Sequence, residues 1–232
     1  MKDNGVIVRE NQFEKLRVFL DTIYEVVERE KKRFKDEVLE SDMSIEEKEQ
    51  EDAQHYYKWE YAVEECMKTS FFLLLISTVE KELKRICTDV KDESNSSIDI
   101  EVGDMKRGIC DASRKYLKTF GNFKKPNIND WKDLEALYKI RNRLIHGNLY
   151  IDEGASKADK KAFGRLLLKD VGLEKDLPVS FGTRKNNRKG YSIKITKEFC
   201  SYAVDMADKF IKTLNQEKHR VFYSPIQSIK KV

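Results

Sequence analysis

Residues 71–90 read FFLLLISTVEKELKRICTDV, and this stretch decides the fold class. Its apolar side chains recur every three or four residues, which is the spacing of one face of an α-helix. The uninterrupted apolar run, from Phe71 to Ile76, is far shorter than the ~20 apolar residues that a membrane-spanning helix needs. We therefore expect a core helix and no membrane partner. The residues of this stripe are Phe72, Ile76, Val79, Leu83, Ile86 and Val90.

Two long antiparallel helices are predicted at the N-terminal side of the chain. Asn11 is placed to cap the first helix. Ser44 and Glu47 have the spacing of a capping box, which predicts the start of a second helix. That helix is expected to continue, with or without a break near Ser70, into the 71–90 stretch.

Downstream of the stripe, glycine, proline and polar clusters divide the chain into shorter elements. We expect a single all-α domain over residues 1–232, a helical bundle of about five main helices with a small β-hairpin insertion and a loose C-terminal tail. The predicted elements are a helix over 104–120 ended by Gly121, a helix over 131–147 capped by Asn129 or Asp130, a short helix over 162–168, a hairpin over 178–195, a last helix from Thr196 and a tail over 217–232.

Charge is distributed unevenly, although the formal net charge is only +4. The segment 106–125 carries seven basic residues and one acid, Asp111, whereas the segment 46–65 carries eight acids and two lysines. A protein polarised in this way could present its basic side to a polyanion. The same pattern also fits a solvated helix face on which charges cluster by chance.

Cysteines and histidines give no sign of a metal site. The four cysteines contain no Cys-x-x-Cys pair, and the three histidines lack metal-ligand spacing, so we expect neither a structural zinc nor another cofactor. The N-terminus leads into a charged segment rather than an apolar signal region. These features predict a reduced, cytoplasmic location.

Arg141 is the least expected residue of the predicted 131–147 helix. Trp131, Leu134 and Leu137 belong to its apolar face, and Arg141 falls in the middle of the same arc. An isolated buried charge costs several kcal/mol or more. The guanidinium must therefore meet a carboxylate, a phosphate or an edge of the core that is open to water.

Asn142 and His146 are four residues apart and share one ridge of the same helix. The negative end of the helix should raise the pKa of His146, and a histidine that titrates near neutrality suits acid–base chemistry. Arg141 and His146 differ by about 140° around an ideal helix. Either the arginine side chain curls round the helix, or two copies of the helix meet and share one pocket.

The segment Arg141-Asn142-x-x-x-His146, followed directly by Gly147, resembles the motif of the HEPN superfamily. The resemblance implies a helical bundle and a metal-independent endoribonuclease, commonly a toxin or an antiphage defence effector, whose two protomers join their motifs in a homodimer. It implies catalytic roles for Arg141, Asn142 and His146. Some relatives have a tyrosine two residues after the histidine, where this chain has Asn148 and its nearest tyrosine is Tyr150.

A facing helix of such proteins often carries a polar or acidic residue, and Glu80 is the matching candidate to pair with Arg141. An RNA substrate would be held by basic side chains, and a toxin would require an antitoxin or another regulatory partner. The alternatives are a non-catalytic helical module that binds protein or RNA, a core salt bridge for Arg141, and a surface position for Glu80. The expected RNA-binding residues are Lys115, Lys118, Lys139, Arg143, Arg184 and Lys185.

Overall fold

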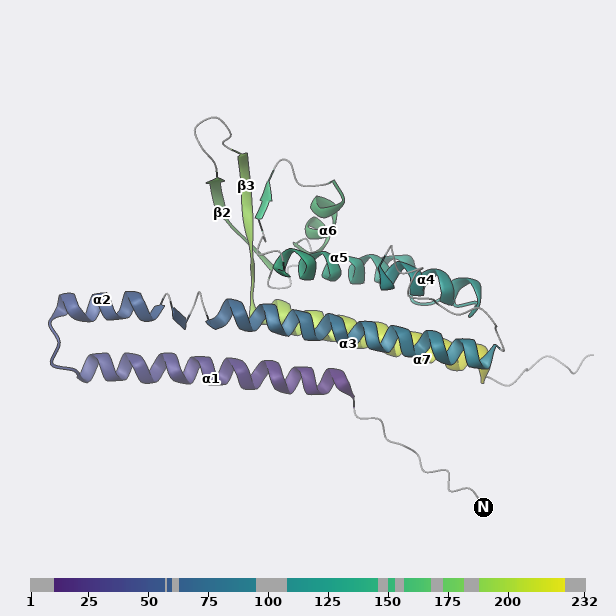
Figure 1. Cartoon of the computed structure of the whole chain (residues 1–232), viewed down its shortest axis with the longest axis horizontal. Coiled ribbons are helices and arrows are strands. Elements are labelled where there is room, and N and C mark those ends of the chain that lie inside the picture. The colour runs from purple at the N-terminus through teal and green to yellow at the C-terminus, as the bar shows by residue number, and fades with distance from the viewer. Residues whose placement is uncertain are drawn as a thin grey trace, which may run out of the picture.

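The computed structural model describes residues 11–56, 58–59, 63–94, 108–145, 150–152, 157–167, 173–181 and 188–223. Within these ranges the chain is predominantly helical, which confirms the expected fold class (Figure 1). The helices are α1 (Gln12–Glu40), α2 (Ile45–Tyr56), α3 (Glu64–Glu93), α4 (Ile109–Thr119), α5 (Ile128–Ile145), α6 (Lys157–Leu167) and α7 (Lys197–Phe222), and the strands are β1 (Tyr150–Asp152), β2 (Leu173–Phe181) and β3 (Arg188–Ile195).

Helix α3 lies at the centre of the bundle. It packs against α1, α4, α5 and α7, and Figure 1 shows α1 running antiparallel to it. Burying one large aliphatic or aromatic side chain contributes on the order of 1.5–3 kcal/mol, so this helix supplies much of the packing energy. The predicted stripe is fully buried, with an exposed fraction of 0% for Phe72, Ile76, Val79, Leu83, Ile86 and Val90.

The second predicted helix is divided into two. Helix α2 ends at Tyr56 and α3 begins at Glu64, while Lys58, Trp59 and Val63 have π-helical geometry. Ser70 lies inside α3. The interruption therefore falls before Ser70, and α2 extends with the C-terminal half of α1 beyond the rest of the bundle (Figure 1).

Two predicted helix caps are confirmed. The Asn11 side chain accepts a hydrogen bond of 3.1 Å from the backbone amide of Phe13 at the start of α1. Before α2, the Ser44 amide donates to the Glu47 carboxylate at 2.8 Å, and the Glu47 amide donates back to the Ser44 hydroxyl at 3.3 Å. The bond from the Ser44 amide also lowers the pKa of Glu47.

The expectation that Gly121 caps a helix is wrong. Helix α4 ends at Thr119, and the residue with left-handed backbone is Asn122, with φ 49°. The amide of Phe123 donates to the carbonyl of Leu117 at 3.1 Å, which folds the chain back over Gly121. A Cβ on Gly121 would lie 2.8 Å from both the Leu117 oxygen and the Phe123 ring. This position requires glycine because of packing.

Helix α5 begins earlier than predicted, and neither Asn129 nor Asp130 is its cap. Asn127 takes this role, since its side-chain oxygen accepts from the amides of Asn129 at 2.8 Å and Asp130 at 3.2 Å. The Asp130 carboxylate accepts in turn from the Asn127 amide at 3.1 Å. The described helix ends at Ile145. The predicted end at residues 146–147 lies outside the described residues. The previous helix, α4, begins at Ile109 after a non-helical Gly108, so its predicted start near residue 104 is wrong.

Three strands form a small antiparallel sheet in the order β1-β3-β2. Strands β2 and β3 cover the segment 178–195 for which a hairpin was predicted, but β2 begins earlier, at Leu173. Residues 182–187 between the two strands lie outside the described residues. Pairing shifts register between Lys175 and Pro178, where proline has no amide to donate. Figure 1 shows the two strands projecting away from the layer of α3 and α7.

The loose tail predicted for 217–232 is wrong at its start, because α7 continues to Phe222. Glu217 is buried, and its carboxylate accepts the backbone amides of Lys124 at 2.7 Å and Lys125 at 3.2 Å. This tie holds the last turns of α7 against the loop between α4 and α5. Residues 224–232 lie outside the described residues.

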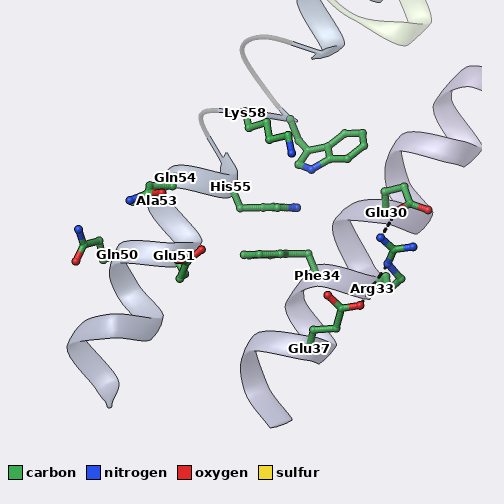
Figure 2. Close-up of a pocket in the computed structure, with 11 residues that line it drawn as sticks. Glu30, Arg33, Phe34, Glu37, Gln50, Glu51, Ala53, Gln54, His55 and Lys58 are labelled. Atoms are coloured by element: carbon green, nitrogen blue, oxygen red, sulfur yellow. Dashed lines mark ion pairs between the residues drawn. The ribbon is translucent and has the colours of Figure 1, made fainter. Parts of the chain in front are cut away.

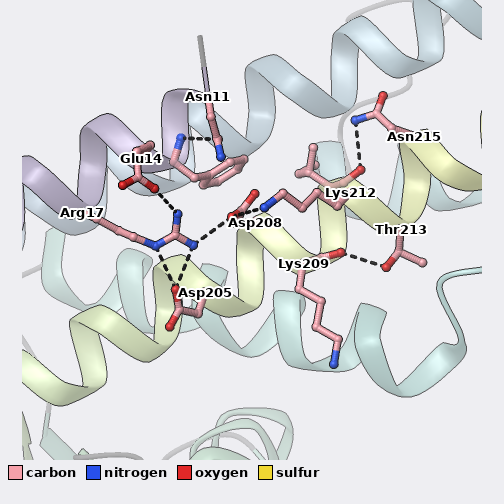
Figure 3. Close-up of polar contacts among 11 residues, drawn as sticks. Asn11, Glu14, Arg17, Asp205, Asp208, Lys209, Lys212, Thr213 and Asn215 are labelled. Atoms are coloured by element: carbon pink, nitrogen blue, oxygen red, sulfur yellow. Dashed lines mark hydrogen bonds and ion pairs between the residues drawn. The ribbon is translucent and has the colours of Figure 1, made fainter. Parts of the chain in front are cut away.

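An ion-pair network joins α1 to α7 (Figure 3). The guanidinium of Arg17 contacts Asp205 and Asp208, each at 2.8 Å, and Lys212 also reaches Asp208 at 2.8 Å. The network links the first and last helices of the bundle.

Over the described residues, none of the helices combines the length and apolarity that crossing a bilayer demands.

Candidate functional site

Arg141 lies near the end of α5, on a segment held firmly by the core. Leu137 and Ile140 have an exposed fraction of 0%, and Leu144 of 8%. Arg141 itself is half-buried rather than sealed in the core. Among the described residues it has no carboxylate partner. The core salt bridge considered from the sequence is therefore not formed within these residues.

The first two motif residues bind each other. Nη1 of Arg141 donates to Oδ1 of Asn142 at 2.9 Å, which fixes one side of the guanidinium plane. Asn142 is exposed. Nε of Arg141 is buried and has no hydrogen-bond partner among the described residues. A buried charged donor without an acceptor is costly, so an acceptor that reached this nitrogen would gain a strong hydrogen bond.

Tyr138 is a candidate residue that sequence reasoning assigned only to the apolar face. It stands one turn before Arg141, and its hydroxyl is buried without a partner among the described residues. Burial raises the pKa of Tyr138 above its ordinary value, the negative charge of Glu80 adds to this, and Arg141 opposes it. The signal available in the sequence was an aromatic residue with a polar tip three positions before the arginine.

Glu80 is half-buried on α3 and acts electrostatically on Tyr138. In the described part of the chain it forms no ion pair with Arg141, so the expected direct pairing is absent there. Glu80, Tyr138 and Arg141 nevertheless belong to one cluster at the contact between α3 and α5.

The remaining expected site residues are placed unequally. His146, Arg184 and Lys185 lie outside the described residues. Lys115 is exposed and pairs with Asp111 at 3.0 Å. Lys139 and Arg143 are half-buried on α5, and Lys118 is exposed on α4.

A separate pocket of ≈ 860 Å³ lies between the protruding ends of α1 and α2. Figure 2 shows Phe34 and His55 stacked face to face across it, with ring centroids 3.5 Å apart and planes 3° apart. Burial lowers the pKa of His55 below its ordinary value, whereas Asp52 opposes this. Neutral imidazole stacks readily on an aromatic ring, and the contact joins the two helices. The pocket contains none of the predicted site residues.

The described residues contain no group of three or more His, Cys, Asp or Glu side chains that could hold a metal ion. The four cysteines are free, and only Cys66 is exposed. Comparison with protein-family models, curated proteins and solved structures finds no match to this chain. The site must therefore be interpreted from its own chemistry.

Proposed function

We propose that this protein is a metal-independent endoribonuclease of the HEPN type, with Arg141, Asn142 and His146 as catalytic residues. The observation that supports the proposal most directly is a pair of buried donors that have no hydrogen-bond partner among the described residues, Nε of Arg141 and the hydroxyl of Tyr138. They lie one turn apart on the same helix, where residues i and i+3 are neighbours.

A phosphodiester fits this pair. Both atoms are donors, and a phosphate offers oxygen acceptors and a negative charge that suits the guanidinium. Asn142 accepts from Nη1 of Arg141 at 2.9 Å, whereas Nε keeps its donor capacity. Because Nε is buried in the free protein, the arginine side chain must move for a phosphate to reach it. The Tyr138 hydroxyl is protonated at neutral pH and can donate, as for an ordinary tyrosine. Burial raises its pKa further, and the charge of Glu80 acts in the same direction.

The proposed reaction is an internal transesterification. The ribose 2′-oxygen attacks the adjacent phosphorus, a bond forms between them, and the bond from phosphorus to the 5′-oxygen breaks. His146 removes the proton of the 2′-hydroxyl while water protonates the leaving 5′-oxygen, or it protonates the leaving oxygen while water accepts the proton of the 2′-hydroxyl. Either role contributes ~10²–10⁴-fold. Arg141 stabilises the charge that develops on the phosphoryl oxygens, worth on the order of 3–4 kcal/mol. The products are a 2′,3′-cyclic phosphate and a 5′-hydroxyl.

We place the complete site at a homodimer interface. On one ideal helix Arg141 and His146 point about 140° apart, and two symmetric copies can supply the missing partner to each other. Ile145 between them is 45% exposed and could be covered in such a dimer. The proposed biological role is a toxin or antiphage effector that acts on cytoplasmic RNA and is restrained by an antitoxin or regulatory protein.

A mixing experiment tests the composite site. Arg141→Ala and His146→Ala proteins are each expected to be inactive on total RNA in EDTA. When they are unfolded together and refolded, a mixed dimer contains one site with both residues intact, so cleavage should reappear. Cleavage by either variant alone at the wild-type rate would contradict the proposal. Absence of recovery, with mixed dimers demonstrated, would place both residues in one protomer.

The second candidate function is a non-catalytic helical module that binds RNA or protein. The hydrogen bond between Arg141 and Asn142 favours this function, because two neighbouring side chains that bind each other can have a purely structural role. Binding of RNA without any 2′,3′-cyclic phosphate product would support this function. The hairpin of β2 and β3 is proposed as an accessory surface in either case.

A further inference from the structure

A second pocket, of ≈ 680 Å³, lies where α4 meets α5. Its size is within the range of small-ligand sites. Its lining contains basic, amide and apolar side chains and no Asp or Glu. The basic side chains that line it are Arg114, Lys115, Lys118, Lys124 and Lys125.

These five cations differ in how far they are paired with acids. Arg114 pairs with Asp111 at 2.7 Å, and Lys115 pairs with the same carboxylate at 3.0 Å. Lys118, Lys124 and Lys125 are exposed, and their ammonium groups form no ion pair within the described ranges. Like charges that converge on one cavity repel each other, and a bound anion relieves this repulsion.

The loop that carries two of these lysines is held rigidly. The Glu217 carboxylate accepts both of their backbone amides and is itself paired with Arg220 at 2.8 Å. Buried Pro126 and the left-handed Asn122 define the turn on either side. A ligand therefore meets ammonium groups on a fixed backbone, which lowers the entropy cost of binding.

The inner surface of the pocket is apolar. Phe123, Pro126, Trp131 and Leu214 line it beneath the charged rim. A free phosphate would use only the rim, whereas a nucleotide unit can also place its ribose or base edge against the aromatic side chains. Trp131 and Arg141 are ten residues apart on α5, about 15 Å along the helix axis, so one strand could reach both places.

We infer that the α4–α5 pocket is a second RNA contact, in which Lys118, Lys124 and Lys125 bind the phosphodiester backbone away from the point of cleavage. The inference rests on the proposed function for the identity of the polyanion. It adds a backbone-binding subsite that is separate from Arg141.

Binding of a short 2′-O-methyl oligoribonucleotide tests this assignment without cleavage, because its nucleophile is blocked. The variant is Lys118→Gln/Lys124→Gln/Lys125→Gln, and the charge-matched control is Lys32→Gln/Lys84→Gln/Lys209→Gln, three exposed lysines on other helices. Loss of three phosphate contacts should weaken binding on the order of 10- to 100-fold and reduce the slope of log affinity against log salt by about 2. The control should bind as the wild type does.

Four results would overturn the assignment. The first three are unchanged affinity and slope in the pocket variant, an equal loss in the control, and displacement of the oligonucleotide by polyglutamate as effectively as by RNA. Competition by inorganic phosphate alone at equal phosphate concentration would reduce the site to a free-phosphate site and overturn the RNA assignment. Replacement of the same three lysines by arginine should retain binding. If the protein binds RNA through the pocket but cuts none, the proposed nuclease function is contradicted and the RNA-binding subsite still stands.

Discussion

Tyr138 and Arg141 lie one helical turn apart on α5, and each keeps a buried polar atom without a hydrogen-bond partner among the described residues. Buried donors of this kind cost about 1–3 kcal/mol each, which folding alone does not recover. An acceptor that binds both atoms would recover it. A substitution that removes one of these donors is therefore expected to stabilise the free protein and to weaken its binding of substrate.

Replacing Tyr138 with phenylalanine tests that opposition. The free energy of unfolding should stay unchanged or rise by up to about 1 kcal/mol, because the unsatisfied hydroxyl is removed. RNA cleavage should fall by about 10-fold or more, because a donor to the phosphate is lost. Urea unfolding and product formation under single-turnover conditions measure the two effects.

Tyr24→Phe is the matched control. Its hydroxyl is also buried without a partner among the described residues, but it lies on α1 beside Lys197 rather than near Arg141. The stability of this variant should likewise stay unchanged or rise slightly, and its cleavage should stay unchanged. A stability loss above about 1 kcal/mol in Tyr138→Phe would mean that the hydroxyl has a structural partner.

Glu217 should make stability depend on acid pH. Its bonds to Arg220 and to the amides of Lys124 and Lys125 lower the pKa of Glu217 to about 2. Because the folded pKa lies below the unfolded value of about 4.3, the stabilisation is fully present above that value and is lost as pH falls towards 2. Glu217→Gln should cost about 1–3 kcal/mol at pH 7 and progressively less below pH 4.

Unfolding by urea at a series of pH values between 7 and 2.5 measures this difference. Glu82→Gln on α3 is a suitable comparison, since Glu82 pairs with Arg85 at 2.8 Å but accepts no backbone amide from the described residues. A stability difference between wild type and Glu217→Gln that does not shrink with falling pH would contradict the role given to this carboxylate.

Gly121→Ala should destabilise the junction between α4 and α5. The added Cβ would lie 2.8 Å from the Leu117 carbonyl oxygen and from the Phe123 ring, and such overpacking costs typically about 1–3 kcal/mol. Gly164→Ala is the control, because nothing lies within 4 Å of its added Cβ and α6 should gain slightly in helix propensity. Thermal unfolding of both variants measures this contrast. Equal melting temperatures would show that the Phe123 ring can move aside.

Local patterns were readable from the sequence, and long-range ones were not. The α3 stripe and the caps at Asn11 and Ser44 depend on residues within one or two turns of each other. The contact of Glu217 with Lys124 joins residues 93 positions apart, and no periodicity predicts it. Because this contact is not visible in the sequence, residues from 217 onward were expected to form a loose tail.

The candidate site was predictable only in part. Arg141 was recognisable as a charge on an apolar face, and the structure shows it half-buried with one orphaned donor. The sequence did not predict that Glu80 acts on Tyr138 rather than pairing with Arg141. It places Glu80 on a facing helix, but it does not define which α5 side chain lies within reach of the carboxylate. The N-cap of α5 was predicted wrongly for a related reason. Asn127, Asn129 and Asp130 are equivalent candidates until the conformation of the backbone turn is known.

The central claim is that His146 and Arg141 cut RNA without a metal, and cleavage in EDTA measures it most directly. Wild-type protein should release fragments with 2′,3′-cyclic phosphate ends, and His146→Ala should release none while its helical circular dichroism stays unchanged. His219→Ala, which alters an exposed histidine of α7, should cut as the wild type does. Undiminished cleavage by His146→Ala, or no cleavage by the wild type in either EDTA or Mg²⁺, would contradict the account.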